Sequence, residues 1–564
     1  MTGVKNEHDI YAETAIGQIP RLLSMMDRKE FSLNYGCLDR PYWQYRMIDF
    51  PGASFQTAAL SLAMAYKNNY PHSVYFNNRR VKKWAIAAIQ FLAKIQNADG
   101  SFSHFYPNIW SLAVVAFPVY SVSEAYLLLE DEMDNRTKES LYSMFKKAGD
   151  WMVRCDDMEV TNQMAGAAMA LYNIYLITQD NKYLVDSQAK IDRILTTQTP
   201  DGYFYEYGGG DIGYSTVTID YLAKYYQKTG KEYLLEPLER LIEYVSYFFH
   251  PNFTSGGEYA SRNNEFVIPG GFEILADRIP LAGTIGDFVL NGLKEKAIID
   301  SATLDGLYLC VNNHSYLEAY ENYKPRKKTE PIPHYQKGIR YFPFSKTLVI
   351  NNDAFYSVVG AGKGGTIRIY TRNGSQSRLL LDDCGLVGRL SNSTVVSSQW
   401  LDPDYKIDYD ENKRLISIKG NLHRINQASL TSCKLFLSRI VLSVISKLPS
   451  VRRFIYKKLR QILITKSSSF PVGFKRDIQF YDEKIIIVDH VIREKSLKFL
   501  YLDALSKFTT MYGQSKEFFQ PQELFSLEGF PREDFTNLFN KRGNAALSRT
   551  IYPREEKIEW HIVS

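Results

Sequence analysis

The sequence predicts an α+β protein of more than one domain, in which an N-terminal (α/α) toroid precedes a C-terminal antiparallel β-sandwich with an inserted basic helical hairpin. Three observations lead to this prediction. The chain has 564 residues, too many for one ordinary core. The apolar spacing is helical to about residue 320 and follows a two-residue period after about residue 339. A short motif also recurs after two of the helical segments.

The N-terminal half carries the helical pattern. Apolar residues recur at three and four positions in segments 55–66, 81–95, 121–129, 141–152, 163–177, 217–227 and 234–249. Short stretches with Asn, Asp, Gly or Pro separate these segments. Many paired antiparallel helices in one domain indicate either a toroid or a bundle.

The repeated motif favours the toroid. Residues 96–102 read QNADGSF and residues 198–204 read QTPDGYF, and each follows a predicted helix and leads into an aromatic loop. Two similar units of helix, DG turn and aromatic loop indicate a repeated helical hairpin. We therefore assign residues 1–325 to a toroid that carries the catalytic site.

Residues 326–338 are charged and proline-rich and are predicted to be a linker. Residues 339–564 form the predicted β-sandwich domain. Its expected strands are 341–350, 354–359, 365–370, 415–418, 478–481 and 484–488, which alternate apolar and polar residues between turn signals.

A basic segment interrupts the strands. Residues 428–466 hold nine Lys and Arg and no acid, so the net charge of +6 leaves about −3 for the rest of the chain (6 − 9). This distribution argues against a nucleic-acid partner. Pro449 divides an insertion at about 429–466 into two amphipathic helices. The insertion either contacts a membrane surface or an anionic polymer, or packs on the sandwich with its basic face in water.

Cysteine usage and the first residues bear on localisation. The five cysteines are scattered without CxxC spacing, which favours a reducing compartment. The N-terminus lacks the apolar stretch of a signal peptide, and we expect no apolar run long enough to span a bilayer. The expected localisation is cytoplasmic, with a possible peripheral position at the inner face of the membrane. The isolated histidines predict no metal site, and we expect no cofactor.

Residues 201–226, DGYFYEYGGGDIGYSTVTIDYLAKYY, contain a DG turn and Glu206 ahead of a tyrosine that opens the next helix. The segment resembles the corresponding part of heparinase II/III-like and alginate-lyase-like polysaccharide lyases. The resemblance implies that Tyr214 is the catalytic tyrosine and that Glu206 lies at the substrate. A phenol can remove the C5 proton of a uronate and protonate the leaving C4 oxygen. A core tyrosine at a helix start is the alternative.

A second patch, Thr161-Asn162-Gln163, resembles the Asn-His step with which these lyases hold the substrate carboxylate. Asn162 fits the role of an uncharged donor that neutralises this carboxylate. Gln163 stands where the family has histidine, and this departure removes a general base. The alternative is a helix N-cap.

Three further patches supply candidate substrate contacts. In segment 256–273, Arg262 is a candidate carboxylate clamp, unless an Arg–Glu network only pins the loop. His104 is the candidate replacement for the missing base. The remaining candidates are the polar and aromatic residues of these loops, namely Tyr42, Trp43, Arg46, Tyr106, Asn108, Tyr259, Asn263 and Glu265.

Together these features predict a lyase that acts on a uronate-containing polysaccharide or oligosaccharide by C5 proton abstraction and β-elimination. Three alternatives stay open. A uronyl C5-epimerase of surface-polysaccharide biosynthesis shares the first step. A glycoside hydrolase could use Glu206, Asp211, Glu258 or Glu265 as acid and base. A non-catalytic polysaccharide-binding protein would explain Gln163.

Overall fold

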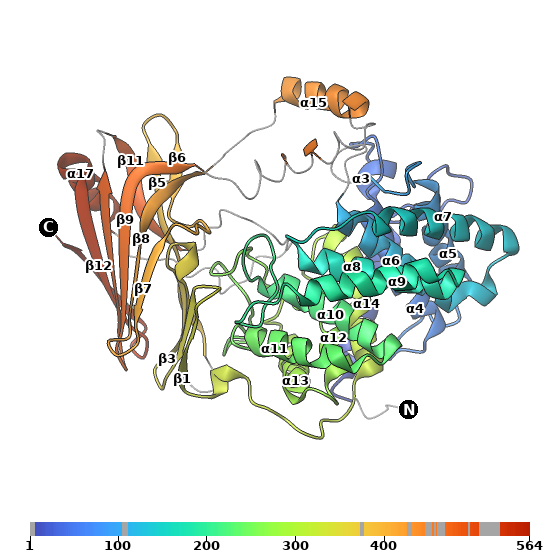
Figure 1. Ribbon diagram of the computed structural model, residues 1–564, viewed down its shortest axis with the longest axis horizontal. Coiled ribbons are helices and arrows are strands. Elements are labelled where there is room, and N and C mark those ends of the chain that lie inside the picture. The colour runs from blue at the N-terminus through green and yellow to red at the C-terminus, as the bar shows by residue number, and fades with distance from the viewer. Residues whose placement is uncertain are drawn as a thin grey trace.

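The computed structural model describes residues 6–103, 111–372, 377–425, 431–445, 454–455, 458, 468–493, 497–506 and 531–563. A helical domain and a β domain lie side by side, with the N-terminus on the helical domain and the C-terminus on the β domain (Figure 1). The helical period and the strand period of the sequence thus correspond to separate domains.

The helical domain is an (α/α) toroid, as predicted. In the described part of the chain, the helices α4, α6, α8, α10, α12 and α14 each contact the next, and α14 closes the ring by contacting α4. The helices α5, α7, α9, α11, α13 and α1 pack around this ring. The bounds are α1 (Asp9–Ile16), α2 (Ile19–Met25), α3 (Arg40–Trp43), α4 (Ala58–Lys67), α5 (Arg79–Lys94), α6 (Leu112–Leu129), α7 (Asn135–Val153), α8 (Thr161–Thr178), α9 (Asn181–Leu195), α10 (Ile212–Thr229), α11 (Leu235–Ser246), α12 (Gly270–Leu275), α13 (Pro280–Lys294) and α14 (Gly306–Asn322).

Helix α6 belongs to the inner ring of helices, and its side chains are mostly apolar for this reason. The stretch Leu112–Glu132 is long and apolar enough to cross a membrane, so the expectation that no such run exists was wrong. The protein itself covers most of this helix, with 72% of the apolar window buried. An inner helix that neighbours contact on nearly every side needs apolar residues all round.

The two DG turns perform the same task in two hairpins. Gly100 and Gly202 adopt φ of 94° and 99°, and a Cβ there would lie 2.1 Å from the Lys147 carbonyl oxygen and 2.5 Å from that of Arg240. Only glycine allows the turn to approach the outer helix this closely. The turns differ at the aspartate. Asp99 accepts from Ser101 in its own turn, whereas Asp201 accepts from the backbone N–H groups of residues 344 and 345 in the β domain, at 2.9 and 2.8 Å.

The β domain contains one antiparallel hydrogen-bonded network in the order β1-β2-β3-β4-β5-β6-β8-β9-β10-β12-β13, with β11 added to β5 and β7 to β8. Helix α17 (Arg532–Arg542) packs on β11 and β12. The strands are β1 (Gly338–Phe342), β2 (Thr347–Asn351), β3 (Phe355–Gly360), β4 (Thr366–Thr371), β5 (Leu379–Leu390), β6 (Val395–Ser397), β7 (Lys406–Asp410), β8 (Leu415–Ile425), β9 (Ser469–Phe480), β10 (Ile485–Arg493), β11 (Phe499–Ser506), β12 (Asn544–Tyr552) and β13 (Lys557–Val563).

Strand β3 is buried on both faces. Phe355 and Val359 join the core of the β domain, whereas Tyr356 and Val358 join the core of the toroid. Alternate side chains of a strand point to opposite faces, so this strand is covered by one core on each side. The sheet therefore packs directly on the toroid.

A buried charge cluster holds strands of the β domain together. The Arg476 guanidinium of β9 bonds to Asp489 at 2.6 Å and to Asp383 of β5 at 3.2 Å. Arg549 of β12 bonds to the same two carboxylates, at 2.5 Å for Asp383 and 2.7 Å for Asp489. All four side chains are fully buried, and each charge is compensated.

The segment between α14 and β1 includes the predicted linker, and it is docked on the toroid. Arg326 bonds to the buried Glu273 at 2.7 Å and to Asp287 at 2.9 Å. His334 bonds through Nδ1 to the Phe249 carbonyl oxygen at 2.8 Å. Arg326 and His334 therefore fix this segment to the toroid by specific contacts.

The basic insertion contains α15 (Ser432–Ile445), which lies over the toroid near α3 (Figure 1). Arg439 approaches Asp49 to 3.3 Å and lies over the Phe50 ring. The predicted second helix, after Pro449, falls largely outside the described residues.

Candidate active site

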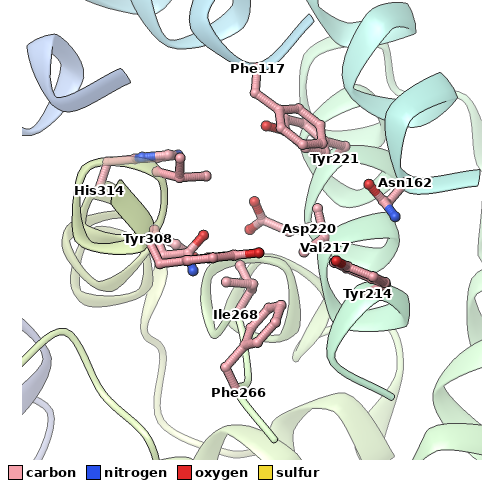
Figure 2. A pocket seen from close by; sticks show the side chains of 13 residues that line it. Phe117, Asn162, Tyr214, Val217, Asp220, Tyr221, Phe266, Ile268, Tyr308 and His314 are labelled. Carbon is pink, nitrogen blue, oxygen red and sulfur yellow. The ribbon is translucent and has the colours of Figure 1, made fainter. Parts of the chain in front are cut away.

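A small cavity opens among the inner helices of the toroid (Figure 2). It has a volume of about 60 Å³ and is lined by side chains from α6, α8, α10 and α14 and from the segment before α12. Tyr214, Asn162 and Tyr308 reach it from the first turns of three of these helices. Because pockets that enclose a whole drug-sized molecule measure roughly 300–1,000 Å³, this cavity holds no more than one sugar ring.

Two tyrosines face one another across the cavity (Figure 2). Asp211 accepts from the backbone N–H of Tyr214 at 2.9 Å, and Asp305 accepts from that of Tyr308 at 2.9 Å, so each aspartate caps the helix that its tyrosine opens. Burial raises the pKa of Tyr214 well above its usual value, and the Arg262 guanidinium acts against this rise. Burial also raises the pKa of Tyr308 to about 12, while a hydrogen bond with Tyr214 lowers it.

Glu206 fixes the position of Asn162. The backbone N–H of Asn162 donates to Glu206 Oε1 at 2.8 Å, and its side-chain amide donates to Oε2 at 2.6 Å. An amide group has two N–H donors, so one is left for a ligand. Burial raises the pKa of Glu206 well above its usual value. The predicted substrate contact thus serves as a support for the asparagine.

Arg262 is connected to Tyr214 through the ring of Tyr207, which lies between them. Its guanidinium carbon is 4.9 Å from the centroid of the Tyr207 ring, and this ring is 5.8 Å from that of Tyr214. Tyr207 has a positive φ of 55°, which is uncommon for residues other than glycine and is often found at functional sites. The structure therefore brings Tyr214, Asn162 and Arg262 into one region.

The loop that carries Arg262 is held by the β domain. Arg368 of β4 donates to the Gly256 carbonyl oxygen at 2.8 Å and bonds to Glu265 at 2.6 Å and to Asp382 at 2.8 Å. Lys363 donates to the Ala260 carbonyl oxygen at 2.7 Å. Both side chains are buried and neither lines the cavity, so they support the loop without entering the cavity.

Three predicted substrate contacts belong to this support. Glu265 binds Arg368 as described, Tyr259 bonds through its hydroxyl to His250 Nε2 at 2.9 Å, and Asn263 donates to Glu258 at 2.6 Å. None of the three lines the cavity, and the Arg–Glu contact that holds this loop is made by Arg368 of the β domain and not by Arg262. This contact connects two domains, which the sequence did not indicate.

Other predicted residues lie elsewhere. The Gln163 side-chain oxygen accepts from the backbone N–H of Ala113 at 3.1 Å, at the start of α6. Trp43 donates to the Met25 carbonyl oxygen at 2.7 Å, and Tyr42 and Arg46 lie in the same N-terminal segment. His104, Tyr106 and Asn108 fall outside the described residues.

Three more residues line the cavity but were not predicted from the sequence, namely Tyr308, Asp220 and His314. A signal for Tyr308 was present, because Asp305-Gly-Leu-Tyr308 repeats the pattern Asp211-Ile-Gly-Tyr214. His314 was taken as isolated, since its neighbours in the fold come from another helix. No group of three or more potential metal ligands occurs among the described residues.

Comparison with known proteins shows the same kind of architecture. Residues 68–270 match the family model of the ulvan lyase N-terminal domain. The structure of chondroitin AC lyase from Streptomyces coelicolor A3 in complex with chondroitin sulphate superposes with a TM-score of 0.57 and 10% identity, over 90% of this chain and 69% of that chain. A mutant of that enzyme gives 0.51 and 11% over the same shares. No curated protein matches the chain.

Identity this low shows the fold alone. The expected resemblance to polysaccharide lyases with an (α/α) toroid is confirmed by the family model and the chondroitin AC lyase structure together. The family model covers α5 to α11, including the helices that carry Asn162 and Tyr214.

The contact between the domains can be tested with Arg368→Ala. This change leaves Glu265 and Asp382 buried beside a lost cation, so we expect the free energy of unfolding to fall by about 3–5 kcal/mol. Arg378→Ala is the control, because Arg378 is half exposed in its pair with Glu556 and its loss costs about 1 kcal/mol or less. Urea unfolding measures both. Similar small losses would contradict a clamping role for Arg368.

Proposed function

We propose that this protein is a polysaccharide lyase that cleaves a uronate-containing polysaccharide by β-elimination. The observation that carries the proposal is the pair of facing hydroxyl groups of Tyr214 and Tyr308 in a cavity that Asn162 also lines (Figure 2). The match to the ulvan lyase N-terminal domain supports the same class of reaction. The acidic polysaccharide is accordingly the proposed partner.

The proposed reaction begins with the substrate carboxylate at the free N–H of Asn162. This donor stabilises the charge that develops on the carboxylate when the C5–H bond breaks, and the Arg262 guanidinium, which lies against Tyr207, acts at longer range and favours the Tyr214 phenolate. The Tyr214 phenolate takes the C5 proton, a C4–C5 double bond forms, and the C4–O bond breaks. The same hydroxyl then returns a proton to the leaving oxygen. Tyr308 assists by its hydrogen bond with Tyr214.

The contacts of the carboxylates favour elimination over glycoside hydrolysis. Hydrolysis needs two carboxyl groups that flank the bond. Glu206 is bound to Asn162 and Glu265 to Arg368, while Asp211 caps α10 and Glu258 accepts from Asn263. None of the four is among the described residues that line the cavity. Epimerisation shares the first proton transfer, so it is separated from elimination by experiment.

Tyr214→Phe tests the proposal directly. Incubation of the wild type with ulvan, chondroitin or another uronate polymer is expected to produce the ultraviolet absorbance of a 4,5-unsaturated uronate. Removal of the hydroxyl eliminates both proton transfers, so we expect the rate to fall by about 10²–10⁴-fold. Tyr205→Phe is a matched control on the segment that precedes α10, because Tyr205 is partly exposed and does not line the cavity.

The products distinguish the alternatives. Exchange of the C5 hydrogen with deuterated water without chain cleavage would indicate an epimerase. Cleavage to saturated ends would indicate a hydrolase. Full activity of Tyr214→Phe would exclude the tyrosine as the base, and binding without either reaction would indicate a non-catalytic protein.

The pH dependence follows from the environment of Tyr214. Its pKa is raised by burial, so the phenolate is a small fraction at neutral pH and increases about tenfold per pH unit. We expect kcat/KM to rise continuously from pH 7 to pH 9, when initial rates of product absorbance are measured. A maximum near pH 6 would point to a carboxylate or histidine base instead.

A second proposal concerns α15. Phe436, Leu437, Ile440 and Val441 are 66%, 60%, 49% and 44% exposed. With 100° per residue they occupy one arc of about 140°; Arg439 and Leu442, which meet the protein, lie outside this arc, as does Leu435, which is 42% exposed. An apolar face turned to water marks an interaction surface.

The partner that fits this face is an anionic lipid bilayer. The nine positive charges and the absence of acids in residues 428–466 complement lipid headgroups, while the apolar side chains enter the interface. Peripheral binding at the inner face of the membrane, with the protein in the cytoplasm, completes this proposal.

Vesicle co-sedimentation tests the membrane contact. We expect the wild type to pellet with phosphatidylglycerol-containing vesicles but weakly with phosphatidylcholine alone. The double variant Phe436→Asp and Ile440→Asp is expected to remain in solution. Val185→Asp, on an exposed position of α9, is the control. Equal pelleting of all variants would contradict the proposal, and concentration-dependent dimerisation through α15 would assign the face to a second copy of the chain.

A further inference from the structure

The cavity has a floor of polar groups that the proposed elimination does not use. Asp220, Asn312 and His314 line it with exposed fractions of only 3%, 6% and 3%. Among the described residues, Asp220 Oδ1, Asn312 Nδ2 and His314 Nδ1 have no hydrogen-bond partner. A buried polar atom without a hydrogen-bond partner lowers the stability of the fold. Three such atoms that line one cavity therefore indicate that a ligand binds there.

The charges behind the floor are already paired. Lys224 lies 2.5 Å from Asp220 Oδ2 and 2.7 Å from Glu318 Oε2, so one lysine serves two carboxyl groups. No cation of the floor is left to attract an anion. A sulfate or carboxylate would therefore be repelled, and the ligand group must be uncharged.

The donors and acceptors of the floor indicate which uncharged group of a ligand would bind there. His314 Nε2 lies 3.9 Å from Glu318 Oε2, too far for a hydrogen bond, so Nδ1 can accept a hydrogen bond in one tautomer and donate one in the other. Burial lowers the pKa of His314 to about 3, so the ring is neutral. The floor then offers one acceptor, Asp220 Oδ1, one donor, Asn312 Nδ2, and His314 Nδ1, which can take either role. Two neighbouring hydroxyl groups match this set, since each can donate and accept.

The side walls suit a sugar ring. Phe117 is stacked on Tyr221 with centroids 5.4 Å apart, and Phe266 lies at the opposite side of the cavity (Figure 2). Aromatic faces cover the apolar faces of a pyranose. Tyr214 and Asn162 are at the other end of the same cavity, where the proposed reaction has C5 and its carboxylate (Figure 2).

We infer that this floor is a specificity site for the C2 and C3 hydroxyl groups of the uronate itself, the edge of the ring that lies across from C5. The inference rests on the proposed function for the placement of C5. It means that the uronate must be free of sulfate at these hydroxyls, whatever substituents the neighbouring sugars carry. Asn312, His314 and Asp220 therefore select the substrate and do not take part in the proton transfers.

Binding of two small probes tests the inference. Methyl β-D-glucuronide and its 2-O-sulfate are titrated into the full-length protein and followed by NMR. The wild type is expected to bind the unsulfated probe and to bind the sulfated one at least tenfold more weakly. Asn312→Ala removes one hydrogen bond to the ligand, so its Kd is expected to rise about 5-fold.

Asn313→Ala is the matched control on the same helix. Asn313 is fully buried and donates to the Ala15 carbonyl oxygen at 3.4 Å, so its loss should lower the melting temperature. Asn312→Ala removes an unpartnered donor and should leave the melting temperature unchanged or higher. A purely structural role of Asn312 would lower the melting temperature and leave the Kd unchanged.

Equal binding of both probes, no binding by the wild type, or unchanged binding by Asn312→Ala would overturn the inference, and the last result would mean that the floor holds only water. These results are separable from those on the reaction. Absence of an unsaturated product with intact, sulfate-sensitive binding counts against elimination alone. Elimination with an unchanged KM in Asn312→Ala counts against the floor alone.

Discussion

The burial of the Arg368 guanidinium between the domains is the interaction on which the geometry of the site depends. It bonds to a carboxylate and a carbonyl of the toroid and to a carboxylate of the sheet at once. A buried cation with these partners holds its loop in one arrangement, because any displacement leaves a charge uncompensated. Arg262 is part of this loop, so its position is fixed with it. Tyr207 contacts Arg262, and Tyr214 contacts Tyr207, so the loop also positions these two rings. The β domain is thus part of the site without contributing to the cavity.

Helix starts provide the second layer of organisation. Tyr214, Tyr308 and Asn162 stand in the first turns of α10, α14 and α8, and in each case a carboxylate accepts from the backbone N–H of the residue. The inner helices converge with these ends at one cavity. At α10 and α14 the capping aspartate therefore has two consequences, since it stabilises the helix and orients the tyrosine that lines the cavity.

The sequence predicted much of the fold and only the centre of the site. The helical period predicted a toroid or a bundle, the DG echo favoured the toroid, and the strand period predicted the antiparallel β domain, because these signals are local. Tyr214 and Asn162 were found from short motifs. Glu206, Tyr259 and Glu265 were predicted at the substrate but bind other protein groups, since a buried polar side chain takes whichever partner the tertiary fold brings to it. His314 was passed over for the same reason, because most groups around it come from other helices, Tyr120 from α6 and Asp220 and Lys224 from α10.

Segment 341–350 illustrates a limit of period counting. It was predicted as one strand, but the turn between β1 and β2 divides it at residues 343–346. The backbone N–H groups of residues 344 and 345 in that turn are the ones that Asp201 accepts. Asp201 therefore has its hydrogen-bond partners in another domain, whereas Asp99 in the equivalent hairpin has its partner, Ser101, in its own turn. The two hairpins of this toroid are therefore not interchangeable, because only the second carries hydrogen bonds to the β domain.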